Sequence, residues 1–202
     1  GGMMLVDGDP SQAWEAASKA GQLADLLRAV PGLARADALR AALFTPVSTL
    51  LGGSPEPAVR AAAVAALPHI RADAAAFDLL ARELDPARGA DPAVRAAAIA
   101  ALRRIPSPAW PKASVEPLAR ALVALLKDTP AERRTERDAV SAVQLGEALA
   151  AALPDDAKRA ILRDIRALGV RVITLDTIPE QLLYDLQWFV VEAGKPVQIV
   201  LV

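Results

Sequence analysis

The chain of 202 residues has 23 basic and 24 acidic side chains and a net charge of −1, which disfavours a protein that holds nucleic acid through phosphate contacts. It has no cysteine and one histidine, His69, which excludes disulfides, thiolate metal sites, cysteine nucleophiles and metal sites built from several histidines. No run of about 20 apolar residues occurs, so no helix is expected to span a membrane.

The N-terminal end is predicted to be a leader followed by two helices. Residues 1–10 begin with two glycines before the first methionine, which we interpret as a cloning remnant, and they lack the basic flank and length of a signal peptide. Helices are predicted over residues 11–29, with a break near Gly21, and over residues 36–51.

An internal repeat follows these helices. The segment Pro57–Leu67 recurs 35 residues later as Pro92–Leu102, and a period of this length predicts a repeat architecture. Each copy carries an apolar face at helical spacing and begins with a proline in its first turn, and Asp91 is the expected N-cap of the second copy. Residues 73–84 are predicted to form the partner helix of the unit. The predicted helical core is lined by Val59, Leu67, Val94, Ile99, Leu102 and Leu122.

The composition changes sharply near Leu168, after further predicted helices over 114–127, 136–152 and 155–168. Residues 1–167 hold 45 of the 46 alanines, and alanine favours helices and is depleted in strands. We therefore expect a helical repeat domain over residues 11–168 and a strand segment over residues 169–202.

Three strands are predicted in that segment, at Val170–Leu175, Trp188–Glu192 and Pro196–Val202, with a turn at residues 193–196. The last strand is expected to form a ladder with one of the other two or with a second molecule. Its alternate apolar residues are expected to be buried, on the last helices around Ile161, Ile165 and Leu168 or against another chain. These alternate residues are Val197, Ile199 and Leu201.

Two parts of the sequence resemble known families. The paired P-x-V-R-x-A-A-[VI]-x-A-L segments resemble HEAT repeats of the short, HEAT-like variety. The segments Ile178–Asp185 and Phe189–Val197 resemble the opening strands of a plastocyanin/azurin-type copper domain, a cupredoxin. In particular, they resemble those attached to HEAT repeats in large multidomain bacterial proteins that also carry β-propeller and cytochrome c parts.

The resemblance implies a mainly α fold: a HEAT-like α-solenoid of antiparallel helix pairs, with a short C-terminal β segment that is an incomplete cupredoxin-like sheet. In that family the copper-binding histidines, cysteine and methionine follow the strands that are matched here. No catalytic, cofactor-binding or metal-binding residue is therefore assigned in this chain, and copper is implied only for the intact family domain.

The function expected from these observations is that of a non-catalytic scaffold or interaction segment of a multidomain, extracytoplasmic electron-transfer protein, periplasmic by resemblance. Its partners would be the remaining domains of a larger polypeptide or another protein. The alternative is a free-standing HEAT-type protein-binding module that uses its C-terminal strands for β-augmentation. A HEAT-like DNA-repair enzyme is disfavoured because residues 1–167 carry too little excess positive charge.

Several polar residues are candidates for metal, catalytic or anion-binding sites. His69 is expected to be a helix-end histidine without metal or catalytic partners. Arg60 and Arg95 occupy equivalent repeat positions, and we expect each to pair with an acid on the next repeat rather than to line an anion-binding groove. A basic cluster is interspersed with acids, which favours a solvated face. That cluster comprises Arg133, Arg134 and Arg137.

The aromatic residues and one acidic pair are predicted to have structural roles rather than binding or catalytic ones. The tryptophans Trp14, Trp110 and Trp188 lie in separate predicted elements, which favours packing over a ligand cage. Tyr184 is expected to cap the β core. The pair Asp155-Asp156 is expected to complement a helix dipole.

Overall fold

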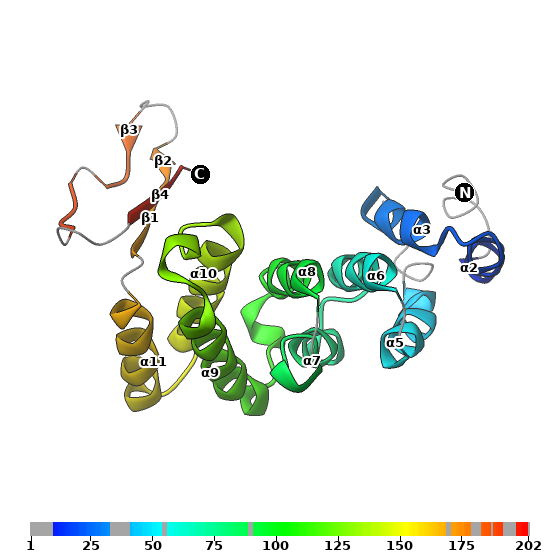
Figure 1. The fold of residues 1–202 in the computed structure, drawn as a ribbon, viewed down its shortest axis with the longest axis horizontal. Coiled ribbons are helices and arrows are strands. Elements are labelled where there is room, and N and C mark those ends of the chain that lie inside the picture. The colour runs from blue at the N-terminus through cyan, green and yellow to red at the C-terminus, as the bar shows by residue number, and fades with distance from the viewer. Residues whose placement is uncertain are drawn as a thin grey trace. The chain divides into compact units, whose positions relative to one another are not determined.

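The computed structural model describes residues 10–32, 41–53, 56–88, 91–168, 171–178, 183–186, 188–191 and 197–201. These residues form a mainly helical protein with short strands towards the C-terminus (Figure 1). The chain divides into two compact units, Gly1–Ser114 and Val115–Val202. This division falls inside one long helix, and the domain boundary expected near Leu168 stays a prediction. The predicted leader at 1–9 and the turn at 193–196 lie outside the described residues.

Helices make up the first unit. They are α2 (Pro10–Lys19), α3 (Leu23–Ala29), α5 (Phe44–Gly52), α6 (Pro57–Ile70), α7 (Ala74–Arg82) and α8 (Pro92–Leu102), with single 3₁₀ turns at Val30–Gly32, Pro86–Arg88 and Ser107–Ala109. The predicted break near Gly21 is confirmed. Gly21 has a φ of 67°, and the N–H of Gln22 donates to the carbonyl of Ala17 at 2.8 Å, so α2 ends in a Schellman motif that favours glycine.

The two copies of the repeat are the helices α6 and α8, which pack against each other and against α7. Fully buried alanines such as Ala63 and Ala98 leave room for close approach of the helices. Four predicted core residues of this unit are confirmed as buried: Leu67, Val94, Ile99 and Leu102. Val59 is only half-buried, although its equivalent Val94 is fully buried. The repeat sequence therefore sets which face turns inwards, and the neighbouring helices set how far that face is covered.

Capping and aromatic contacts fix the ends of these helices. The carboxylate of Asp73 accepts from the N–H groups of Ala75 and Ala76 at 3.1 and 3.2 Å, and Asp91 accepts from the N–H of Ala93 at 2.8 Å, so the predicted N-cap of α8 is confirmed. The partner helix α7 buries Phe77 against the ring of Trp110, with the ring centroids 6.0 Å apart.

The second unit contains most of α9 (Lys112–Asp128), then the 3₁₀ turn Ala131–Arg133, α10 (Arg137–Ala151) and α11 (Asp155–Ala167). Leu122 is buried as predicted. Helices α10 and α11 pack closely at Gly146, where an added Cβ would lie 3.0 Å from the Cδ1 atom of Ile165. A larger residue at this position would therefore meet a side chain that is itself only 1 % exposed.

The strands of this unit form two small sheets. Strand β1 (Arg171–Leu175) pairs in parallel with β4 (Val197–Leu201), with Ile173 opposite Ile199, which confirms the expected ladder between the first and last predicted strands. Strand β2 (Thr177–Ile178) pairs antiparallel with β3 (Leu183–Tyr184), a pairing that the sequence did not predict.

One expectation about the strands is wrong, and one of two alternatives for another is excluded. The described residues 188–191 are not a strand, because β-propensity measures fit to a pleated surface and a strand also needs a neighbour for its backbone groups. Ile199 and Leu201 are 50 % and 61 % exposed, so they are not buried on the last helices, and their burial against another chain stays a prediction. Strand β1 contacts α10 and takes the buried positions, Ile173 and Leu175, which leaves their neighbours on β4 at the surface.

Candidate interaction surface

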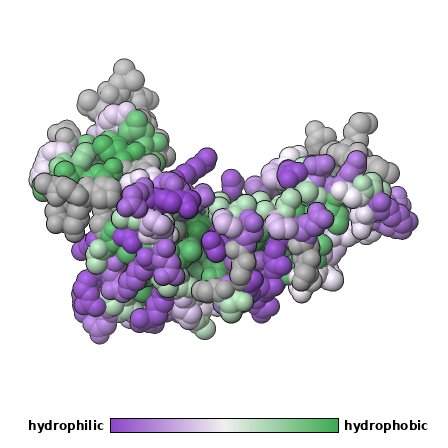
Figure 2. Space-filling view, in the orientation of Figure 1, coloured by the Kyte–Doolittle hydropathy of each residue, from purple (hydrophilic) through white to green (hydrophobic). Residues whose placement is uncertain are grey.

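The large apolar side chains that remain exposed are concentrated in one segment. Among the described residues, every large hydrophobic side chain that is at least 36 % exposed lies between positions 184 and 201. Figure 2 shows hydrophobic surface gathered over this segment. We call these side chains the apolar strand surface: Tyr184, Leu186, Trp188, Phe189, Val190, Val191, Ile199 and Leu201. Because the described helices bury their own large apolar side chains, this surface is unlike the rest of the described chain.

Strand β4 contributes both side chains and backbone to this surface. The sheet has the strand order β1-β4, so one edge of β4 has no ladder partner among the described residues. The strand reads VQIVL and carries no charge and no proline. Edge strands of soluble proteins are commonly protected by lysine, proline or a bulge, and β4 has neither of the two residue types.

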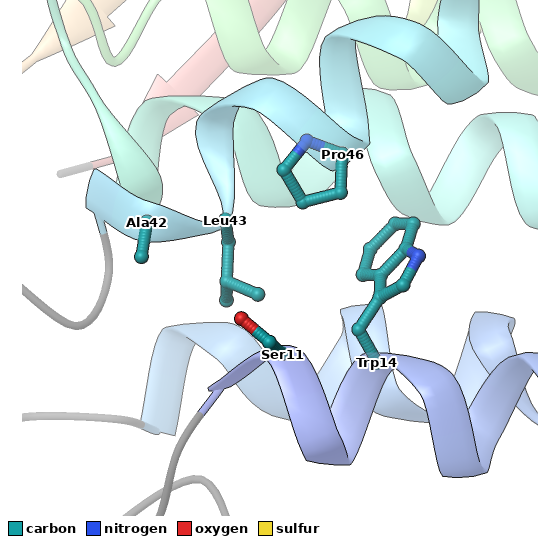
Figure 3. Close-up of a pocket in the computed structure, with 5 residues that line it drawn as sticks. All are labelled: Ser11, Trp14, Ala42, Leu43 and Pro46. Carbon is teal, nitrogen blue, oxygen red and sulfur yellow. The ribbon is translucent and has the colours of Figure 1, made fainter.

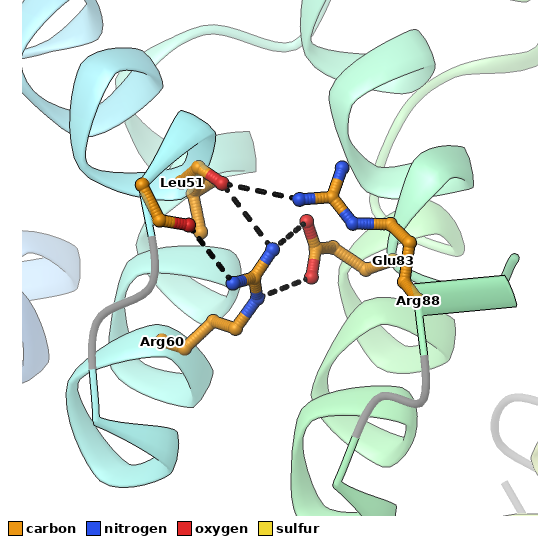
Figure 4. Close-up of polar contacts among 5 residues, drawn as sticks. Leu51, Arg60, Glu83 and Arg88 are labelled. Atoms are coloured by element: carbon orange, nitrogen blue, oxygen red, sulfur yellow. Dashed lines mark hydrogen bonds and ion pairs between the residues drawn. The ribbon is translucent and has the colours of Figure 1, made fainter.

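The strongest polar cluster lies elsewhere, where Arg60 joins three helices (Figure 4). Its guanidinium donates to the carboxylate of Glu83 at 2.6 and 3.0 Å, and also to the carbonyls of Leu51 at 3.2 Å and Gly53 at 3.4 Å. Glu83 is the buried charged residue of the described chain, at 2 % exposure. Its hydrogen bond to Arg60 raises the pKa of that guanidinium. Arg88 also donates to the Leu51 carbonyl, at 3.4 Å.

The hydrogen bonds of this cluster satisfy backbone carbonyls at the C-terminal end of α5, so its role is structural. The Arg60 guanidinium is bound to the Glu83 carboxylate and to two backbone carbonyls, so its charge is already paired within the cluster. The expected pairing of Arg60 with an acid is confirmed, but the acid follows α7 in the same repeat rather than lying on the next one. Arg95 makes no ion pair with any described residue, and position 118, which lies 35 residues after Glu83, is a leucine within α9.

Two arginines of the predicted basic cluster make local contacts of their own. Arg133 makes a two-point contact with Glu136 at 2.9 Å for both bonds, and that contact lowers the pKa of the Glu136 carboxyl, as expected of a solvated face. Arg134 instead donates to the backbone carbonyls of Thr129, Lys127 and Leu168. It thereby satisfies carbonyl groups at the C-terminal ends of α9 and α11. Sequence reasoning missed this role because backbone carbonyls leave no signal in a residue pattern.

The three tryptophans lie in separate elements, as predicted, and differ in burial. The indole N–H of Trp110 donates to the carbonyl of Ile105 at 2.9 Å, which confirms a packing role. Trp188 is 77 % exposed, so the packing expected of it is wrong within the described residues. Tyr184 is likewise 41 % exposed and does not cap a core. Both residues belong to the apolar strand surface.

The remaining candidates are His69, the pair of aspartates and a pocket. His69 is half-buried in the last turn of α6, and Asp155 and Asp156 lie in the first turn of α11, as expected. A pocket of about 270 Å³ lies between α2 and α5 (Figure 3) and is lined by Ser11, Trp14, Ala42, Leu43 and Pro46. Among the described residues, those that line it carry no carboxylate, imidazole or amine.

One carboxyl group has an unusual environment. Glu147 lies on α10, where partial burial raises the pKa of its carboxyl, and the positive charge of Arg166 partly opposes that rise. It stands alone: within the described ranges, no group of three or more histidine, aspartate or glutamate side chains could hold a metal ion.

Comparisons with known proteins add no family. No family model, curated protein or solved structure matches the chain. Among the described helices, none is both long and apolar enough to cross a bilayer.

Proposed function

We propose that the protein is a non-catalytic interaction scaffold, in which a HEAT-like helical solenoid carries a strand segment that binds a protein partner by strand addition. The observation that supports this proposal is the confinement of the exposed large hydrophobic side chains to the apolar strand surface. Strand addition supplies main-chain hydrogen bonds to an open edge and pockets for alternate side chains, and β4 offers both an open edge and apolar neighbours.

The size of the surface fits this role. Eight large side chains exposed by 36 % to 77 % present roughly 700 Å² together, close to the ~800 Å² that one partner contributes to a standard protein interface. At about 25 cal/mol per Å², covering this area would provide on the order of 15 kcal/mol before the cost of association. A surface of this kind supports stable binding without any catalytic group.

The test is selection of peptide ligands from a random display library on the full chain. We expect the recovered peptides to be extended sequences with alternating apolar residues, which bind the wild type and lose binding to Ile199→Lys. The matched control is Ala148→Lys, an exposed position on α10, which should bind as the wild type does. Peptides that bind all three proteins equally would contradict the proposal.

A second candidate is a segment of a multidomain, extracytoplasmic electron-transfer protein. The resemblance of Ile178–Asp185 and Phe189–Val197 to cupredoxin strands supports it, and the open edge of β4 is compatible with further strands of such a sheet. Copper would then bind residues outside this chain. The coding sequence after Val202 tests this: an asparagine, a histidine within a few residues and a later Cys-His-Met cluster would support it, and a stop codon would contradict it.

A further inference from the structure

We propose that β4 pairs antiparallel with β4 of a second copy of the chain, about a two-fold axis at Ile199, so that the protein forms a homodimer through its strand segment. This inference rests on the proposed function, because it names the occupant of the apolar strand surface. It follows from three properties of β4: its open edge, its self-complementary sequence and the weak charge of the chain.

The edge of β4 is the better of the two edges of its sheet. Strand β1 begins with Arg171 and contacts α10, whereas β4 has no charged residue from Val197 to Leu201. An edge that presents unpaired N–H and C=O groups and no charge is a template for another strand. Pairing like with like also closes the contact at this edge, because both copies use the same β4 edge and the interface is isologous.

The sequence of β4 is complementary to itself in one antiparallel register. With Ile199 on the axis, Ile199 lies opposite its own mate and Val197 lies opposite Leu201 of the second copy. These are the residues of one face, since side chains alternate along a strand. Opposed apolar pairs of this kind stabilise antiparallel strands. In the dimer, the exposed parts of the Ile199 and Leu201 side chains are covered by Ile199 and Val197 of the second copy.

The net charge of the chain and its exposed apolar area are both compatible with this pairing. The chain carries a net charge of only −1, so two copies repel each other weakly. The exposed apolar side chains available to such a contact present roughly 700 Å² in each copy, against ~800 Å² per partner in a standard interface, and Ile199 and Leu201 are the ones on β4 itself. A foreign strand would also fit the edge, but only the second copy is guaranteed to carry the matching residues.

The first measurement is the mass of the full chain by sedimentation between about 1 and 200 µM, the range in which a dimer of modest affinity would assemble. We expect a monomer–dimer equilibrium. Ile199→Lys and Ile199→Glu should each weaken the dimer at least tenfold, because like charges then face each other on the axis. An equimolar mixture of the two variants should restore it. A wild-type monomer throughout, or larger open-ended assemblies, would overturn the inference.

Cysteine cross-linking provides the register, and the natural chain has no cysteine to interfere. Ile199→Cys should form a disulfide-linked dimer under mild oxidation. The matched control is Leu201→Cys on the same strand, whose mate is displaced by four residues, roughly 14 Å, beyond the ~7 Å limit of a disulfide. Leu201→Cys should cross-link only when mixed with Val197→Cys. Equal self-cross-linking of the Ile199 and Leu201 variants would overturn the pairing.

The outcomes separate this inference from the proposed function. A monomeric wild type that still selects extended peptides through Ile199 would overturn self-pairing and leave the strand-binding scaffold standing. A dimer that persists unchanged in both Ile199 variants, together with peptides that ignore Ile199, would overturn both.

Discussion

Removal of the Glu83 carboxylate is the sharpest test of how the first unit is held together. In the native structure Arg60 is 16 % exposed and Glu83 2 % exposed, and two hydrogen bonds join them. Replacing Glu83 with alanine leaves the Arg60 guanidinium largely out of water with only the carbonyls of Leu51 and Gly53. Breaking a buried ion pair from one side costs about 3–5 kcal/mol.

We expect the lower end of that range, about 3 kcal/mol, because Arg60 keeps its two carbonyl acceptors and part of its solvent contact. The matched control is Glu116→Ala. Glu116 also pairs with an arginine, Arg120, but the two side chains are 41 % and 60 % exposed, so its loss should cost less than about 1 kcal/mol.

The assay is urea denaturation of both variants and the wild type, followed by far-UV circular dichroism at constant protein concentration. A double variant with Arg60→Met and Glu83→Leu should recover part of the loss, because the apolar pair leaves no unpartnered charge. If Glu83→Ala and Glu116→Ala lost the same free energy of unfolding, the argument from burial would be refuted.

Three further predictions concern the helices. Leu102→Ala should lower the free energy of unfolding by about 2–5 kcal/mol in denaturant titration, since Leu102 is fully buried, and a loss below about 0.5 kcal/mol would mean that α8 is misassigned. Gly146→Ala should lower it by up to about 2 kcal/mol, because about 1–3 kcal/mol of overpacking against Ile165 outweighs about 1 kcal/mol of helix propensity; a stabilised variant would show that Ile165 moves freely. Glu147 has a raised pKa in the folded state, so its carboxyl stabilises the fold when protonated and that contribution is lost as pH rises through the folded pKa. Glu147→Gln should therefore raise the melting temperature at neutral pH but not below the ordinary carboxyl pKa of 4.5, and a gain independent of pH would contradict the assignment.

Local patterns predicted those parts of the fold that depend on neighbours in sequence. The repeated prolines at 57 and 92 mark the first residues of α6 and α8, and Asp91 caps its helix as expected. Gly21 ends α2 because only a few residues adopt its left-handed backbone. These features are decided within a few residues, so a single sequence contains enough information to place them.

Features that depend on distant residues were not predictable in the same way. The burial of Glu83 is set by Arg60, 23 positions earlier, and nothing next to Glu83 marks it as buried. The exposure of Ile199 depends on which strand contacts α10, and the apolar alternation of β4 is the same whether it is covered or not. The candidate surface was therefore visible from sequence as an apolar strand with an open edge, but the last helices, one of its two expected covers, leave its side chains exposed.

The ion pair between Arg60 and Glu83 belongs to the first repeat alone, although the sequences of α6 and α8 are nearly identical. If the 35 residues from Pro57 to Asp91 were excised, Arg95 would follow α5 at the spacing that Arg60 now has, and it would meet the same carbonyl groups at the end of α5. At the sequence spacing of Glu83 there would then be Leu118, which lies within α9 and carries no charge, and Arg88 would be gone as well. Excision would thus leave an arginine enclosed without its counter-ion. The repeat is a unit of sequence, but it cannot be removed as a unit unless the segment that remains also supplies an acid to pair with Arg95.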